Sequence, residues 1–141
     1  MDHLLALFDV IGELARRRYQ LAERSFSALG LNHTEARVLT LLHQAGGAAT
    51  QEALSALIFV DRSNVGRALK TLEQNGYIER RKDDRDKRSN LVQTTAKGQE
   101  LFTEIAKLKI TMAQRFFGDL TNEEAGAIVE TLGKVIKHDE D

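Results

Sequence analysis

The stretch RRKDDRDKRSN, residues 80–90, holds six Arg or Lys residues and three Asp residues in eleven positions. A strand-like segment precedes it, YIERR at 77–81, and a second one follows it, NLVQT at 90–94. Two such segments separated by a short polar loop predict a β-hairpin, in which the charged stretch forms the loop. That loop can be a solvated turn, a disordered segment, or the tip of a structure that contacts a polyanion.

The part of the chain before this hairpin has the apolar spacing of helices. Apolar residues at steps of three and four predict four helices, over residues 4–29, about 33–45, 50–59 and 62–75. Their predicted N-caps are Asn32 or Thr34, Thr50 and Asp61. Glycine is expected to end three of them, at Gly30, Gly46 and Gly76.

Two more helices follow the hairpin, over about 96–118 and 122–137. Thr95 is the expected cap of the first, and Thr121 with Glu124 forms a capping box for the second. The predicted fold class is therefore mainly α, with a small β-hairpin wing. Three short helices followed by a hairpin are the pattern of a winged helix-turn-helix, whose second motif helix enters the major groove of DNA. Here that helix is the one over 62–75.

The composition is typical of a globular protein and excludes several kinds of site. The chain has 141 residues, of which 42% are hydrophobic and 29% charged, so we expect one domain. It contains no Cys, which excludes disulfides, thiolate metal sites and thiol-based redox sensing. The four His residues lack the spacing of a metal site, so we expect neither a metal nor a cofactor.

The chain also lacks the pattern of a membrane or exported protein. No apolar stretch is long enough to cross a membrane. The apolar run near the N-terminus is too short for a signal peptide and is interrupted by Asp9 and Glu13. We therefore expect a cytoplasmic protein.

Positive charge gathers in one part of the sequence. Residues 61–97 carry ten Lys or Arg against six Asp or Glu, a net charge of +4, within a chain whose net charge is -1. A locally basic segment in a nearly neutral chain indicates a face that meets a polyanion. A chance fluctuation of an ordinary surface is the alternative.

The helix predicted over 62–75 has side chains suited to DNA. One face is apolar, and polar residues occupy the other face at helical spacing. Arg can bind guanine through two hydrogen bonds, Asn can bind adenine, and Ser or Thr can bind phosphate oxygens. The candidate DNA-binding residues are Arg62, Ser63, Asn64, Arg67, Lys70 and Thr71. An amphipathic helix with a solvated polar face is the alternative.

The hairpin loop offers a second candidate contact with DNA. Arg85, Lys87 and Arg88 are predicted at its tip, where they can reach a minor groove, whose negative potential attracts Arg. Asp86 is close enough in sequence to pair with Arg88 and hold its side chain in a fixed direction. We count these four residues as the candidate wing site.

These motifs resemble those of the MarR family of bacterial transcription regulators. The segment DDRDKRSNLVQTTAKGQEL, residues 83–101, is similar to that family's wing and following helix start, an Asp-x-Arg-Asp-x-Arg run with a later Leu-Thr-x-x-Gly. Thr94 replaces the usual Leu, and Asp84 replaces a frequent Pro. DRSNVGRALKTLEQNGYIERR (61–81) and LNHTEARVLTLL (31–42) extend the resemblance over nearly the whole chain.

The resemblance implies a homodimer that binds a pseudo-palindromic operator in double-stranded DNA. The implied parts are an N-terminal dimerisation helix (1–30), a winged helix-turn-helix lobe (31–98) and C-terminal dimerisation helices (99–141). The terminal helices carry more apolar surface than one small lobe can cover, which agrees with this division. The candidate interface residues are Leu5, Phe8, Phe117, Ile128, Leu132 and Ile136.

The resemblance also implies a small aromatic or phenolic acid as effector, bound between the dimer helices and the lobe. Arg16 and Tyr19 lie on the first helix near that place, and an Arg there can hold a carboxylate. An ordinary solvated basic turn is the alternative. The expected function is a sequence-specific regulator, a repressor that such an effector releases from DNA. A winged-helix protein–protein module without DNA binding is the second hypothesis, and no arrangement of residues indicates an enzyme.

Overall fold

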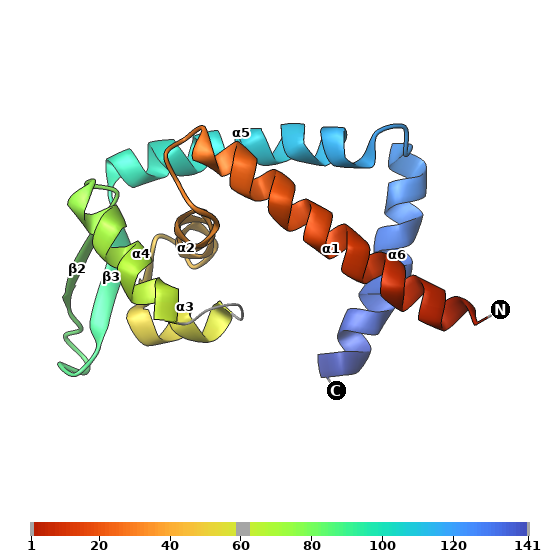
Figure 1. The fold of residues 1–141 in the computed structure, drawn as a ribbon. Coiled ribbons are helices and arrows are strands. Elements are labelled where there is room, and N and C mark those ends of the chain that lie inside the picture. Colours follow the sequence, from red (N-terminus) through yellow and green to blue (C-terminus); the bar gives the residue numbers. More distant parts are fainter. Residues whose placement is uncertain (1, 59–62, 141) are drawn as a thin grey trace.

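The computed structural model describes residues 2–58 and 63–140 (Figure 1). Within these residues the chain forms six helices and three strands. Their order is α1 (His3–Ser27), α2 (His33–Gln44), β1 (Ala48–Thr50), α3 (Gln51–Leu57), α4 (Ser63–Gln74), β2 (Ile78–Lys82), β3 (Asn90–Thr94), α5 (Ala96–Phe117) and α6 (Asn122–Glu140). The mainly α fold class with a hairpin wing is confirmed.

The helix starts follow from the capping residues read in the sequence. Asn32 Oδ1 accepts from the Glu35 backbone N–H and Glu35 Oε1 accepts from the Asn32 N–H, both at 2.8 Å. Thr50 and Thr95 cap α3 and α5 through their hydroxyl oxygens. Such side chains satisfy backbone donors that have no partner inside the helix. The predicted cap Asp61 and the candidate residue Arg62 lie outside the described residues.

The wing is part of a three-stranded antiparallel sheet in the order β1-β3-β2. The prediction of a two-stranded hairpin was therefore incomplete, because β1 pairs with β3 on its other side, with Ala49 opposite Val92. Strand β1 is three residues long and follows two glycines, so it has no alternating pattern that marks a strand. Its pairing anchors the base of the wing to the lobe.

The hydrophobic core lies in the lobe, between α2, α4 and the sheet. Leu39, Leu42, Leu69, Leu72 and Val92 are each at most 1% exposed. Helix α3 buries Leu54 against this core, whereas its Leu57 is 49% exposed. The core thus holds α4 and the wing strands in one unit.

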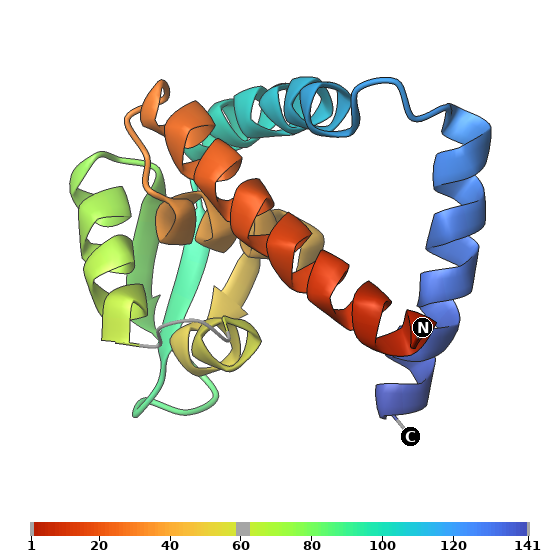
Figure 2. The same ribbon diagram turned by 45° about the vertical axis from the view of Figure 1, so that its right-hand side comes forward.

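The long helices extend away from this lobe. Helix α5 runs along one edge of the molecule, and α6 continues from its far end, opposite the wing (Figures 1 and 2). The C-terminal part of α1 packs beside α5 and α2, where Ala22 and Phe26 are buried. The N-terminal half of α1 leaves the lobe with its apolar residues exposed.

Candidate nucleic-acid interface

Helix α4 packs one face on the core and presents the other to solvent. Val65, Ala68, Leu69 and Leu72 are buried. Ser63, Arg67, Lys70 and Thr71 are exposed, and Asn64 is half-buried. The helix therefore has the polar exposed strip that the sequence predicted, and contact of this strip with DNA stays a prediction.

Two residues of this strip are joined. The Arg67 Nη2 group donates to Asn64 Oδ1 at 2.8 Å. A guanidinium held by a neighbouring amide loses less side-chain entropy when it binds a base. The Arg67 and Asn64 side chains are therefore coupled on the surface of α4, and their contacts with bases stay a prediction.

The wing loop, residues 83–89, is an ordered turn. The Asp83 N–H donates to the Ser89 carbonyl at 3.0 Å, and the Asp83 carboxylate accepts from the Arg85 N–H at 3.1 Å. The Ser89 N–H donates to the Asp86 carbonyl at 2.9 Å. Asp83 thus shapes the turn, because an Asp side chain readily accepts a hydrogen bond from the backbone two residues on.

Asp86 holds Arg88 at the tip of the wing, as predicted. Its Oδ1 accepts from the Arg88 backbone N–H at 3.0 Å and from Arg88 Nε at 3.1 Å. These bonds to the Arg88 side chain and backbone lower the pKa of the Asp86 carboxyl. The Arg88 side chain remains 92% exposed, so its charge is oriented but still available to a ligand.

The strip of α4 and the wing loop lie at the same end of the lobe. In both ribbon views the first described turn of α4 points toward the end at which the 83–89 loop projects (Figures 1 and 2). Arg85, Lys87 and Arg88 are exposed on that loop, and Arg67 and Lys70 are exposed on α4. A helix and a cationic loop side by side can occupy a major groove and the adjacent minor groove.

A separate cavity of about 400 Å³ lies between α1, α2 and α5. Its cationic lining residues are Arg18, Arg37 and Lys109, and His33 also lines it. Much of the remaining lining is apolar or aromatic, including Phe26. Burial of the His33 ring lowers its pKa, and the nearby arginines lower it further against the opposing effect of Glu23.

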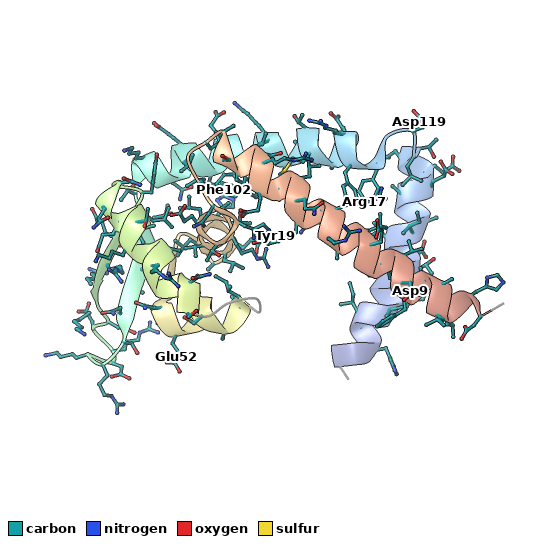
Figure 3. All side chains as sticks on the ribbon, viewed as in Figure 1. Asp9, Arg17, Tyr19, Glu52, Phe102 and Asp119 are labelled. Atoms are coloured by element: carbon teal, nitrogen blue, oxygen red, sulfur yellow. The ribbon has the colours of Figure 1, made fainter. Side chains whose placement is uncertain are left out.

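The two predicted effector residues lie beside this cavity but do not line it. Arg16 is exposed and pairs with Glu13 at 2.6 Å. Tyr19, labelled on α1 in Figure 3, stacks on the His33 ring with centroids 4.8 Å apart. Whether either residue contacts an effector stays a prediction.

Arg18, the last of three consecutive arginines on α1, lines the cavity, as do Arg37 and Lys109, which the sequence did not single out. It lies four residues before Ala22, which in turn lies four before Phe26, and both of these are buried. Residues four apart share one face of a helix, so Arg18 continues the inward stripe. The break in the apolar pattern of α1 at this position was the signal, because a cation in an apolar stripe marks a polar cavity.

Five of the six candidate interface residues are exposed. Leu5, Phe8 and Ile136 are 57%, 77% and 64% exposed, and Phe117 and Ile128 are exposed as well. Leu132 is half-buried. Their role in a dimer stays a prediction.

No helix in the part of the chain that the structure describes is long and apolar enough to cross a membrane. Across residues 2–58 and 63–140, no three His, Cys, Asp or Glu side chains gather in a way that could hold a metal ion.

Comparison with known proteins gives consistent results for sequence and fold. A model of the MarR family matches residues 31–90. YkoM, an uncharacterized HTH-type transcriptional regulator of Bacillus subtilis, is 31% identical over 89% of this chain and 88% of its own length. The transcriptional repressor MprA of Escherichia coli is 28% identical over 80% of this chain and 65% of MprA.

Solved structures share the fold. A mutant MarR from Escherichia coli complexed with operator DNA has a TM-score of 0.78 at 24% identity, covering 95% of this chain and 96% of that one. An organohalide-sensing transcriptional regulator in its 2,4-dichlorophenol-bound form has a TM-score of 0.79 at 20% identity, covering 98% and 82%. Together with the matches in sequence, these findings show that the chain belongs to the MarR family of DNA-binding winged helix-turn-helix transcription regulators, a non-enzymatic family.

Proposed function

We propose that this regulator is a dimeric repressor that a small aromatic acid releases from its operator. The observation that carries the DNA surface is the placement of the α4 strip beside a wing whose Arg88 is oriented by Asp86 and is 92% exposed. The repressor role is supported by the relative MprA, a transcriptional repressor. A repressor needs no further surface, because occupying an operator is enough to block transcription.

In this proposal α4 occupies the major groove and the wing reaches the minor groove. The residues assigned to the major groove are Arg62, Ser63, Asn64, Arg67, Lys70 and Thr71. Arg67 would bind guanine while Asn64 holds it, and Lys70 would bind phosphate. Arg85, Lys87 and Arg88 would be the wing contacts, with Asp86 as their support. A structural neighbour is complexed with operator DNA, which supports this use of the fold.

The proposed dimer is formed by the terminal helices. Residues 1–30 and 99–141 would pair with the same segments of a second chain and leave the lobe, 31–98, free to bind DNA. The support is the exposed apolar surface of α1 and α6, which costs free energy in water unless it is covered. A two-fold dimer predicts half-sites roughly 34–36 Å apart, one turn of DNA.

The proposed effector site is the cavity between α1, α2 and α5. Its apolar walls suit an aromatic ring, and Arg18, Arg37 and Lys109 suit a carboxylate. A structural neighbour binds 2,4-dichlorophenol, which supports an aromatic ligand. The cavity lies between a helix of the lobe, α2, and two helices of the proposed dimer interface, α1 and α5. A ligand bound there can therefore favour one distance between the two lobes of the dimer over another.

The test is selection of binding sites from a random duplex pool at physiological salt. We expect an enriched inverted repeat, whose affinity falls steeply as salt rises because Lys and Arg release counterions from phosphates. No enrichment by a folded dimer would contradict the proposal. If the affinity for duplex DNA does not change with salt, phosphate contacts are not formed, and the alternative of a protein–protein module is favoured.

The effector is tested on the selected duplex by fluorescence anisotropy. We expect benzoate, a minimal aromatic acid, to weaken DNA binding by the wild-type protein. Arg18→Gln should raise the benzoate concentration needed for release, because it removes one cation from the cavity. Arg16→Gln, which removes the same charge two residues away and outside the cavity lining, is the matched control. Equal effects of the two substitutions would contradict the proposed cavity.

A further inference from the structure

One ion pair joins the end of the recognition helix α4 to the first strand of the wing. Arg80, on β2, donates from Nη2 to Glu73 Oε1 at 3.1 Å, and its Nε lies 3.4 Å from the same oxygen. Glu73 lies in the last turn of α4 and is the only acidic residue between 63 and 74. The pair therefore spans two elements whose relative position decides how they meet DNA.

The direction of the Arg80 side chain follows from the strand pattern. Ile78, two residues earlier, is buried, and the strand partner of Arg80 is the buried Val92. Side chains two apart share one face of a strand, so Arg80 lies on the lobe side of β2, whereas Arg81 lies on the outer side and is exposed. The Arg80 side chain is only 25% exposed.

The charge of Arg80 is thus paired at the partly exposed edge between α4 and β2. Although Arg80 belongs to the basic run at 80–90, its guanidinium is 25% exposed and is paired with a carboxylate of α4 that is 40% exposed. Glu73 would otherwise present an unpaired negative charge on the helix that meets DNA. The pairing neutralises that charge and ties the helix to the wing.

Other contacts hold the turn between α4 and β2 from the side of α5. Lys97 Nζ donates to the Asn75 carbonyl and Thr95 Oγ1 donates to the Gly76 carbonyl, both at 2.7 Å. These bonds fix the turn but do not connect the body of α4 to the wing strand. The Glu73–Arg80 pair makes that connection.

We infer that Glu73 and Arg80 are a positioning pair for DNA binding, which sets the angle between the recognition helix and the wing without touching DNA. This inference rests on the proposed DNA surface, in which α4 and the wing loop bind together. Rigid connection of the two elements reduces the entropy lost when both dock at once. Arg80 is therefore a support of the wing and not one of its phosphate contacts.

The direction in which DNA affinity changes when the charge of Glu73 is removed distinguishes a positioning role from an ordinary surface charge. Removing an acid near a polyanion should tighten DNA binding by Coulomb attraction alone. Removing a positioning acid should weaken it. We expect E73Q and R80Q each to weaken binding to the selected duplex roughly two- to fivefold, the range of a partly exposed ion pair.

Three further measurements complete the test. The double variant E73Q/R80Q should bind no worse than either single variant, and the charge swap E73R/R80E should restore affinity to within about twofold. The DNA affinity of R80Q should fall with rising salt as steeply as that of wild type, because no phosphate contact is lost. Amide hydrogen exchange of β2 in the free protein should be faster in E73Q and R80Q, and unchanged in the outward-facing control R81Q.

The outcomes separate this inference from the proposed function. Tighter DNA binding by E73Q, or wild-type exchange of β2 in both single variants, would overturn the positioning pair. R88A tests the DNA surface alone. If R88A binds as well as wild type, the proposed surface is wrong, while hydrogen exchange still decides whether the pair holds the wing.

Discussion

Single side chains at the wing tip decide how much positive charge is exposed there and in which direction it points. The guanidinium of Arg88 is held by Asp86 yet 92% exposed, so in the proposed complex little further ordering would be needed for it to enter a groove. We expect Arg88→Ala to weaken operator binding by about 1–3 kcal/mol and Asp86→Asn to weaken it less. Anisotropy titration of the selected duplex measures both. Wild-type affinity of Arg88→Ala would show that the wing does not bind DNA.

The ring of His33 predicts a dependence of stability on pH. Burial holds its pKa in the folded protein below the ordinary value of 6.5. The unfolded chain therefore binds a proton more readily, so the stability is fully present above pH 6.5 and falls as the pH drops through that value toward the pKa of the folded state.

His33→Gln should reduce this loss, because Gln does not titrate. Urea unfolding of the wild-type and variant proteins at pH values from about 7.5 to about 5, the range in which His titrates, measures this loss of stability. An equally steep pH dependence in the variant would assign the loss to other groups.

At the scale of elements, the contact between α5 and the turn after α4 is unusually close. A Cβ built on Gly98 would lie 2.2 Å from the Tyr77 carbonyl oxygen, which is backbone and cannot move aside easily. The glycine thus lets the first turn of α5 pack directly on the chain that leaves α4. The resemblance to a Leu-Thr-x-x-Gly motif included Gly98 but did not explain why a glycine is needed there. The close approach to the Tyr77 carbonyl supplies that reason.

Gly98→Ala should therefore lower the free energy of unfolding by about 1–3 kcal/mol, the usual cost of overpacking. Gly133→Ala is the matched control, since it also lies inside a helix but its Cβ would meet nothing within 4 Å. That change should stabilise the protein by up to about 1 kcal/mol, because Ala is the better helix former. Thermal and urea unfolding compare the two, and equal effects would contradict the packing argument.

The elements themselves followed closely from sequence, and their differences have local causes. The capping boxes at Asn32 and Thr121 and the cap at Thr95 are formed as expected, because a cap depends on residues within one turn. Helix α1 ends at Ser27 rather than 29, before Gly30 with its φ of 73°. Strand β1 was missed because three residues are too few to show a period.

At the scale of the whole molecule, the apolar surface of α1 and α6 has no cover within one chain. Phe8, 77% exposed, is a large apolar side chain in this surface. Phe8→Asp should shift the protein from dimer to monomer and weaken operator binding, because a buried unpaired carboxylate is costly. Sedimentation equilibrium measures the mass, and anisotropy measures DNA affinity.

Leu57→Asp is the control for self-association. It places the same charge at an apolar residue of the lobe that is 49% exposed, away from the terminal helices. We expect its mass to equal that of wild type. A dimer that survives Phe8→Asp, or is lost equally in Leu57→Asp, would contradict the proposed interface.

The sequence by itself determined the order of the helices, the caps at Asn32, Thr50, Thr95 and Thr121, the exposed face of α4 and the Asp86–Arg88 pair. All of these depend on residues a few positions apart, where helical spacing and turn chemistry act directly. Only the tertiary structure decided that β1 joins the sheet, that Arg18 rather than Arg16 lines the cavity, and that Arg80 turns inward to Glu73. Those outcomes depend on which segments pack together in the folded chain, and the spacing of residues along the sequence does not contain that information.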